Sequence, residues 1–175
     1  MQRQLRCLIL ATPLLSTGVA WSQFAATGTT TLSVTIASAA AIQINTATTT
    51  LTTSGTTFGS AYTGTTSFTY KLRTTQSTGT GAITLQVTAD FSPANGPSVA
   101  GGDPLTYTCT VASGTGCAGS ISASASAATS VATFGADIHS AAAGDAGSTA
   151  WSLSNLPHYK TGTYSATVTY TISAT

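Results

Sequence analysis

Charge is the scarcest property of this sequence, in which only 5% of the 175 residues are charged. Glutamate is absent, so a glycosidase that uses two carboxylates would have to draw both from Asp90, Asp103, Asp137 and Asp145. The pattern places all of these at turns or strand ends. The few lysines and arginines form no basic patch that could neutralise phosphates, and we therefore expect no nucleic-acid partner.

Histidine is also rare, and neither His139 nor His158 lies in a metal-binding spacing such as H-E-x-x-H. No G-x-S-x-G nucleophile elbow and no D-x-D-x-D-G calcium loop occurs. This chain, which is rich in hydroxyl groups, contains serine, histidine and aspartate residues from which a triad could be proposed. Their presence alone is therefore no evidence for a hydrolase. We expect a protein that is not an enzyme, with no catalytic, cofactor-binding or metal-binding residues and no cofactor.

The first residues have the pattern of a secretory leader. Arg3 and Arg6 precede an apolar run from Cys7 to Ala20, which is too short to span a bilayer. This predicts a signal peptide over residues 1–22 and a single β-sandwich domain over residues 23–175. The expected location is extracellular or at the cell surface, by way of the periplasm, with no membrane insertion once the leader is removed.

Only two cysteines follow that leader, Cys109 and Cys117, and they flank the stretch CTVASGTGC. In a secreted chain such a pair is expected to form a disulfide, with Gly114 and Gly116 supplying a turn between two short arms. Two thiols alone do not complete a zinc site.

What the sequence has in abundance is threonine, serine, glycine and alanine, together with 42% hydrophobic residues. Apolar and hydroxyl-bearing residues alternate in many short runs separated by glycine- and proline-containing turns, which is typical of half-buried strands. The clearest runs are Leu32–Ile36, Phe68–Leu72, Ile83–Phe91, Leu105–Val111, a weaker Ile121–Ala127, Trp151–Leu153 and Tyr164–Ala174. The sequence predicts an all-β fold, an Ig-like or jelly-roll-like antiparallel β-sandwich of about 7–9 strands.

Two segments need separate comment. Residues 45–57 are rich in threonine with Leu51 as the one large apolar anchor, and the pattern does not decide between strand and loop. The final run alternates strictly, and because Tyr164 and Tyr170 need burial we expect it to be an internal strand, paired inside its own sheet.

Strand edges expose unpaired N–H and C=O groups, and soluble monomers usually guard them with lysine, proline or inward charge. Residues that protect edges in this way are scarce here, apart from Lys71 and Arg73. The edges could be hidden internally, covered by O-linked sugar, or paired in an assembly. For an assembly, residues 23–36 are a candidate donor strand whose Leu32, Val34 and Ile36 would enter the sheet of a neighbouring subunit. The alternative is that this run is the first strand of its own sandwich.

Four stretches carry a family resemblance: TLSVTIASAAAIQI, TTFGSAYTG, ITLQVTAD and the closing LPHYKTGTYSATVTYTISAT. They resemble the spore coat protein U and archaic fimbrial subunit group of secreted bacterial β-sandwiches. The resemblance implies an Ig-like sandwich and a structural role in a surface fibre or in adhesion, without catalysis. The chain departs from that group at Ala39-Ala40-Ala41, where the group commonly has a cysteine near the end of its first strand.

We therefore expect a non-catalytic, secreted structural subunit of a bacterial pilus-like fibre or surface layer, whose partners are copies of itself or other fibre subunits. The alternative is a monomeric cell-surface module for adhesion or carbohydrate binding. Its candidate glycan platform is Trp151, His158 and Tyr159, because aromatic rings stack on sugars. Such residues are more often part of the core, and Trp151 shares strand parity with Leu153.

Overall fold

The structure is a computed structural model that describes residues 27–53 and 55–175. The predicted signal peptide lies outside the described residues. The chain divides into two units, Met1–Thr35 and Ile36–Thr175, and every strand among the described residues belongs to the second. Within the described part, no helix is long and apolar enough to cross a membrane.

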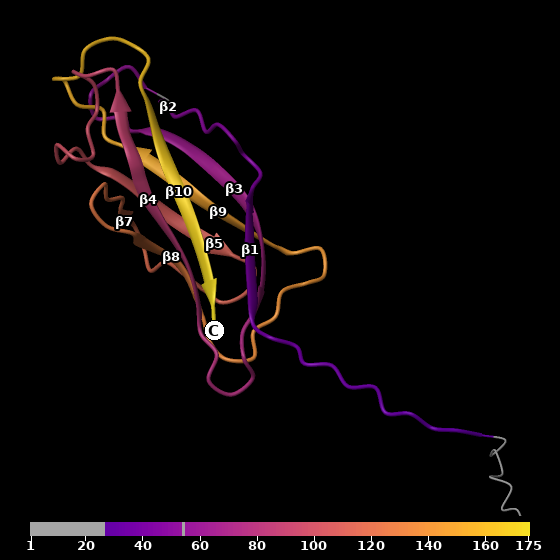
Figure 1. Ribbon diagram of the computed structural model, residues 1–175. Coiled ribbons are helices and arrows are strands. Elements are labelled where there is room, and N and C mark those ends of the chain that lie inside the picture. The colour runs from indigo at the N-terminus through magenta and orange to yellow at the C-terminus, as the bar shows by residue number, and fades with distance from the viewer. Residues whose placement is uncertain (1–26, 54) are drawn as a thin grey trace, which may run out of the picture. The chain divides into compact units, whose positions relative to one another are not determined.

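The second unit is a sandwich of two antiparallel sheets, which confirms the predicted all-β fold (Figure 1). One sheet has six strands in the order β1-β3-β9-β5-β7, with β2 also paired to β3, and the other has four in the order β10-β4-β8-β6. The strands are β1 (Ala39–Ile44), β2 (Thr52–Thr53), β3 (Tyr62–Arg73), β4 (Gly81–Ser92), β5 (Leu105–Val111), β6 (Thr115–Gly116), β7 (Ile121–Ser122), β8 (Thr129–Phe134), β9 (Asp145–Leu153) and β10 (Ser165–Ala174).

The pairs β3–β9 and β5–β9 in one sheet and β4–β10 in the other correspond to the B–E, D–E and C–F pairs of an immunoglobulin sandwich. An immunoglobulin domain places one more strand, G, beside F. Among the described residues, no strand occupies that position beside β10.

The core lies between the sheets and is built from the alternating apolar residues of the long strands. Phe68 and Tyr70 of β3 and Ile83 and Leu85 of β4 are fully buried. Burying each such side chain contributes about 1.5–3 kcal/mol. Gly147 of β9 is required by this packing, because a Cβ there would lie 2.3 Å from the Phe68 ring.

The strand predicted over residues 32–36 is not formed, and the first strand begins at Ala39. The register explains this start. Ala39 pairs with Arg73, the last residue of β3, and the chain then turns away at Thr74, whose N–H donates to the carbonyl of Ile138. β3 therefore has no residue left to pair with the segment before Ala39. In the undecided stretch 45–57, only Thr52–Thr53 forms a strand, beside β3.

The disulfide between Cys109 and Cys117 is present, as predicted. Its setting differs from the expected pair of short arms, because Cys109 belongs to β5 in the six-stranded sheet and Cys117 directly follows β6 in the other sheet.

Replacing both cysteines with alanine should lower the free energy of unfolding by about 2–3 kcal/mol, because the closed loop is short. Urea unfolding of the variant beside the oxidised wild type measures this. An unchanged midpoint would contradict it.

The loop after β4 is held by the Asp90 carboxylate, which accepts hydrogen bonds from the N–H groups of Phe91 and Val99 at 2.9 Å, from Ala100 N–H at 3.2 Å and from the Ser98 hydroxyl at 2.7 Å. Burial raises the pKa of Asp90, but these bonds favour the charged form and together lower the pKa below its ordinary value.

A carboxyl group whose pKa is lower in the folded state adds stability above its unfolded pKa, and this stability is lost as the pH falls through the folded pKa. We therefore expect the free energy of unfolding to fall below about pH 4, and to fall less in Asp90→Asn, which has no such charge. Denaturant unfolding between about pH 5 and pH 3 tests this. Equal slopes for wild type and variant would rule it out.

Candidate functional site

The sandwich has four sheet edges, and two of them are long. The edge strands β7 and β6 have only 2 residues each, whereas β1 has 6 and β10 has 10. Neither long edge strand contains a charged residue or a proline. Short edges and charged side chains are the usual protection against edge-to-edge pairing, so β1 and β10 are the unprotected edges.

The prediction that the final strand is internal is wrong. β10 pairs with β4 on one side, and no described strand pairs with its other side. Its alternating pattern predicts one apolar face. Edge strands and internal strands can both have such a face, so alternation does not distinguish the two. The main-chain groups on the free side of β10 can accept another strand.

The inward face of β10 carries a row of apolar side chains, here called the β10 stripe, that is only half-buried. Its members are Ala166, Val168, Tyr170, Ile172 and Ala174. On the neighbouring strand β4 the residues opposite three of them, Val87, Leu85 and Ile83, are fully buried on the same face. The stripe is less buried than these β4 residues because β4 lies between β10 and β8, whereas β10 has a neighbouring strand on one side alone among the described residues.

β1 lies next to β10 where the two sheets come together, and both strands can be followed along this side of the sandwich (Figure 1). Its residues that face the same way as the core are Ala40, Ile42 and Ile44, which pair with Leu72, Tyr70 and Phe68 of β3. Ile44 remains 37% exposed. The free side of β10, its stripe and β1 together form what we call the open edge.

Tyr170 closes the core beneath the open edge. Its ring centroid lies 5.6 Å from that of Phe68, and its hydroxyl shares a hydrogen bond with the Thr149 hydroxyl of β9. Burial raises the pKa of Tyr170, so its hydroxyl stays protonated at neutral pH. A strand added at the open edge would therefore cover side chains that already rest on a packed core.

Described by itself, the segment before β1 is a second apolar feature. Leu32, Val34 and Ile36 are 92%, 82% and 65% exposed. They lie on one parity, with Ser33 and Thr35 on the other, and residues 27–38 contain no charge. The root of the segment is fixed within the sandwich unit, where Arg73 Nε donates to the carbonyl of Ala37 at 2.8 Å.

The structure does not bring the three residues of the candidate glycan platform together on one surface. Trp151 is 6% exposed, lies in the core with its ring centroid 5.3 Å from that of Tyr107, and donates its indole N–H to the Thr66 hydroxyl at 2.9 Å. The His158 side chain is 61% exposed and stacks edge-on against Tyr159.

His158 and Tyr159 lie beside Asp103, whose carboxylate is 3.4 Å from His158 Nε2. Burial and the negative charge of Asp103 raise the pKa of Tyr159 to about 12. What remains of the platform is a pair on a loop, in which His158 is exposed and Tyr159 is half-buried.

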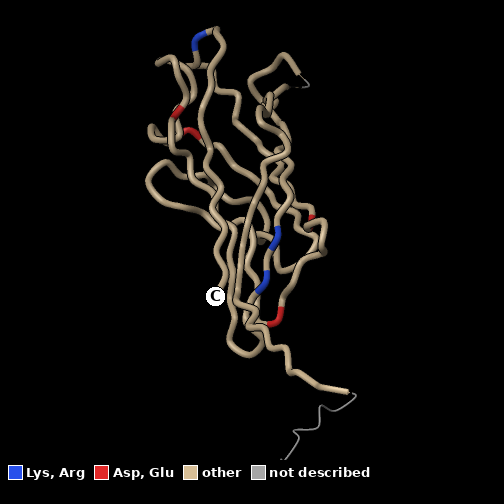
Figure 2. Tube along the Cα trace, turned by 45° about the vertical axis from the view of Figure 1, so that its right-hand side comes forward, with Lys and Arg blue, Asp and Glu red and all other residues tan. Residues whose placement is uncertain are grey.

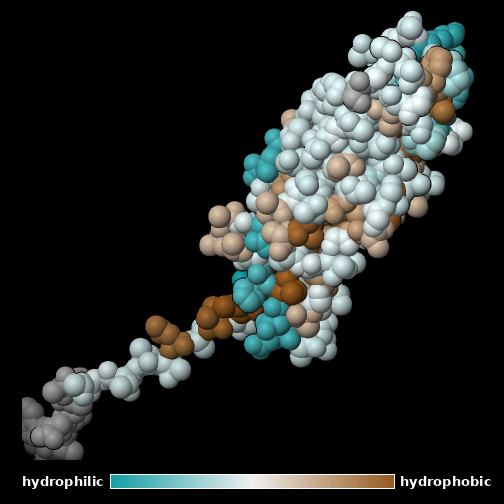
Figure 3. Space-filling view, turned by 180° about the vertical axis from the view of Figure 1, so that it is seen from behind, coloured by the Kyte–Doolittle hydropathy of each residue, from teal (hydrophilic) through white to brown (hydrophobic). Residues whose placement is uncertain are grey.

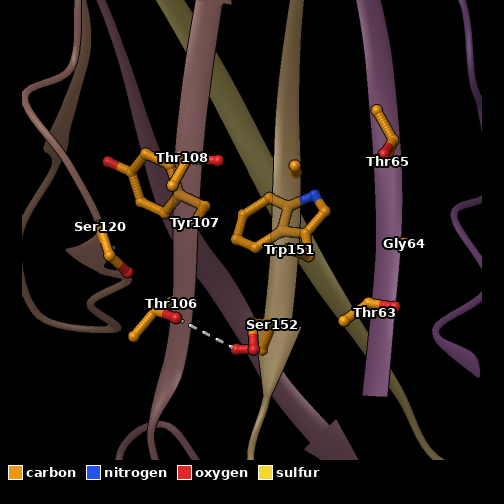
Figure 4. A pocket seen from close by; sticks show the side chains of 10 residues that line it. Thr63, Gly64, Thr65, Thr106, Tyr107, Thr108, Ser120, Trp151 and Ser152 are labelled. Carbon is orange, nitrogen blue, oxygen red and sulfur yellow. Dashed lines mark hydrogen bonds between the residues drawn. The ribbon is translucent and has the colours of Figure 1, made fainter. Parts of the chain in front are cut away.

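A shallow depression of about 340 Å³ lies over β3, β9 and β5 (Figure 4). Its hydroxyl groups come chiefly from Thr63, Thr65, Thr106 and Ser152, and Thr106 Oγ1 donates to the Ser152 carbonyl at 3.4 Å. No aspartate, histidine, lysine or arginine is among its lining residues. In the part of the chain that the structure describes, no three metal-ligating side chains gather to hold an ion.

No family model, no curated protein and no solved structure matches this chain.

Proposed function

We propose that this protein is a non-catalytic, secreted structural subunit of a pilus-like fibre or surface layer, and that copies join by strand addition. Residues 32–36 of one copy lie beside β10 of the next and cover its stripe. The observation that carries the proposal is the pairing of two features in one chain: a ten-residue edge strand with a half-buried apolar face, and an exposed segment with apolar residues at the same spacing.

The chemistry of the two partners matches. A strand added beside β10 gains main-chain hydrogen bonds along the free side, and its alternate side chains reach the stripe. Leu32, Val34 and Ile36 recur every second residue, as do Val168, Tyr170 and Ile172. Each of the three donor side chains would contribute about 1.5–3 kcal/mol on burial.

The rest of the surface suits a building block. Charged residues are few and scattered along the chain (Figure 2). The face of the sandwich seen in Figure 3 is mostly pale, because short hydroxyl-bearing and small residues cover it. The register aligns such residues across strands, for example Thr63, Ser152 and Thr106 in one row. Low net charge removes the repulsion that keeps many proteins apart.

Deleting residues 23–36 tests the proposal. The sandwich should remain folded, because all strands of the described residues lie after this segment. Negative-stain microscopy should show filaments for the wild type and none for the variant. Circular dichroism and denaturant unfolding of the variant provide the folding control. A variant that still forms filaments would refute strand donation by this segment, and one that fails to fold would show that the segment belongs to its own sandwich.

A further inference from the structure

Two consecutive copies would also touch end to end, and each end of the sandwich carries charged residues. The exit end of the sandwich is the end where β1 begins and β10 finishes. There Thr175 N–H donates to the Thr80 carbonyl, and Asp137 N–H donates to the Thr75 carbonyl at 3.0 Å. Asp137 is exposed at this end. The loops of the exit end are residues 74–80 and 135–144.

The distal end is the opposite one, where β10 begins and Ser165 pairs with Ser92. Its loops are tied together by Lys160 N–H, which donates to the Asn95 carbonyl at 3.0 Å, and by the Asn155 amide, which donates to the Thr57 carbonyl at 3.3 Å. Lys160 is exposed there. Asp90 and Asp103 also lie at this end, but their carboxylates accept hydrogen bonds from the loop that follows β4. Phe58, 66% exposed, stands on the distal loop that ends at β3.

The proposed strand addition decides which ends meet. Every pair in the sandwich is antiparallel, and antiparallel ladders are slightly more stable than parallel ones. A donor antiparallel to β10 with Val34 beside Tyr170 has Ile36 beside Val168, toward the start of β10. Only residues 37 and 38 separate Ile36 from β1 of its own sandwich, so Ile36 and Ala39 lie at most about 11 Å apart. The exit end of the donor copy must then abut the distal end of the acceptor copy.

The exit end carries the exposed side chains of both Asp137 and Arg73, so charge alone does not select one direction of the donor. A parallel donor would bring two exit ends together. The antiparallel donor instead brings Asp137 of one copy to the end that carries Lys160 of the other. Opposite charges at a contact fix its orientation more than they add affinity.

We propose that the distal end, through Lys160, is a docking surface for the exit end of a second copy, through Asp137, and that this contact sets the head-to-tail order of the fibre. The inference rests on the proposed function, because strand addition brings the two ends together. Phe58 gives the distal end an exposed aromatic side chain, of the kind that anchors protein interfaces.

A charge-swap cycle on the full chain tests the contact. Lys160→Asp and Asp137→Lys should each raise the critical concentration for assembly about fivefold, because exposed pairs contribute up to about 1 kcal/mol. The variant with both changes should assemble within about twofold of the wild type, because the pair is restored with reversed sign. The difference between each single variant and the wild type should shrink at high salt. Unfolding midpoints of all variants provide the folding control.

Two results would overturn the end contact. One is a pair of single variants that assemble at the wild-type critical concentration. The other is a double variant whose critical concentration is no lower than that of the single variants. Val34→Asp, run in the same series, separates this failure from failure of the proposed function. If Val34→Asp blocks assembly while Lys160→Asp does not, the result supports strand addition and rejects the end contact. If the wild type forms no assembly, or if Val34→Asp assembles as well as the wild type, strand addition falls and the end contact falls with it.

Discussion

Replacing Val34 with aspartate should abolish assembly. In the proposed assembly this side chain would lie on the stripe of the neighbouring β10, where a carboxylate would lose its water without gaining a partner. Such desolvation costs several kcal/mol, and each 1.4 kcal/mol is a tenfold change in affinity. We therefore expect the critical concentration to rise more than about a hundredfold, measured by sedimentation and by counting filaments in negative stain.

The matched control is Thr35→Asp, which adds the same charge one residue along. Thr35 lies on the other parity and would face solvent after strand addition, so this variant should assemble within about threefold of the wild type. Both positions lie before β1 and are exposed, so neither change should alter the unfolding midpoint. Equal effects of the two variants would contradict the proposal that this segment binds as a strand with one buried face and one solvent-facing face.

Replacing Trp151 with alanine should be among the most destabilising changes in the chain. The indole packs against Tyr107 and supplies the N–H that the Thr66 hydroxyl accepts. Removing a buried tryptophan leaves a cavity and typically costs about 3–5 kcal/mol. Trp151→Phe should cost less, because the ring volume is largely kept and only the hydrogen bond is lost. Urea unfolding measures both.

Phe58→Ala is the reference for an aromatic residue outside the core. Its side chain is exposed, so the loss should stay within about 0.5 kcal/mol. A Trp151→Ala variant as stable as Phe58→Ala that also no longer binds immobilised glycans would reverse our assignment of Trp151 to the core. It would also restore the reading of Trp151 as part of a sugar platform.

The sequence predicted β4, β5, β10 and the second half of β3 well, because their alternation is regular, but it predicted only the last 3 of the 9 residues of β9. The runs in β3, β4, β5 and β10 each hold one parity, and the structure buries or half-buries that parity, except for the exposed Ala89 of β4. β8 was missed for a physical reason. Val131 and Ala132 are adjacent and both buried, because the ladder to β4 shifts register between Ile83 and Thr84, and this irregularity interrupts the alternation.

The donor role of Leu32, Val34 and Ile36, which alternation and the lack of charge singled out, stays a prediction. No pattern in a single sequence says which strand ends a sheet. The open edge depends on sheet order, which long-range pairing decides, so β10 was predicted to be internal. The half-burial of the stripe, which carries the functional proposal, became visible only once the neighbours of β10 were known.

An electron cryomicroscopy map of the assembled protein tests the central claim most directly. The account predicts density for an added strand along the free side of β10, traceable as residues 32–36 of a second copy, with Leu32, Val34 and Ile36 directed onto Val168, Tyr170 and Ile172. Filaments in which that side of β10 is empty, or is filled by the copy's own residues, would contradict it.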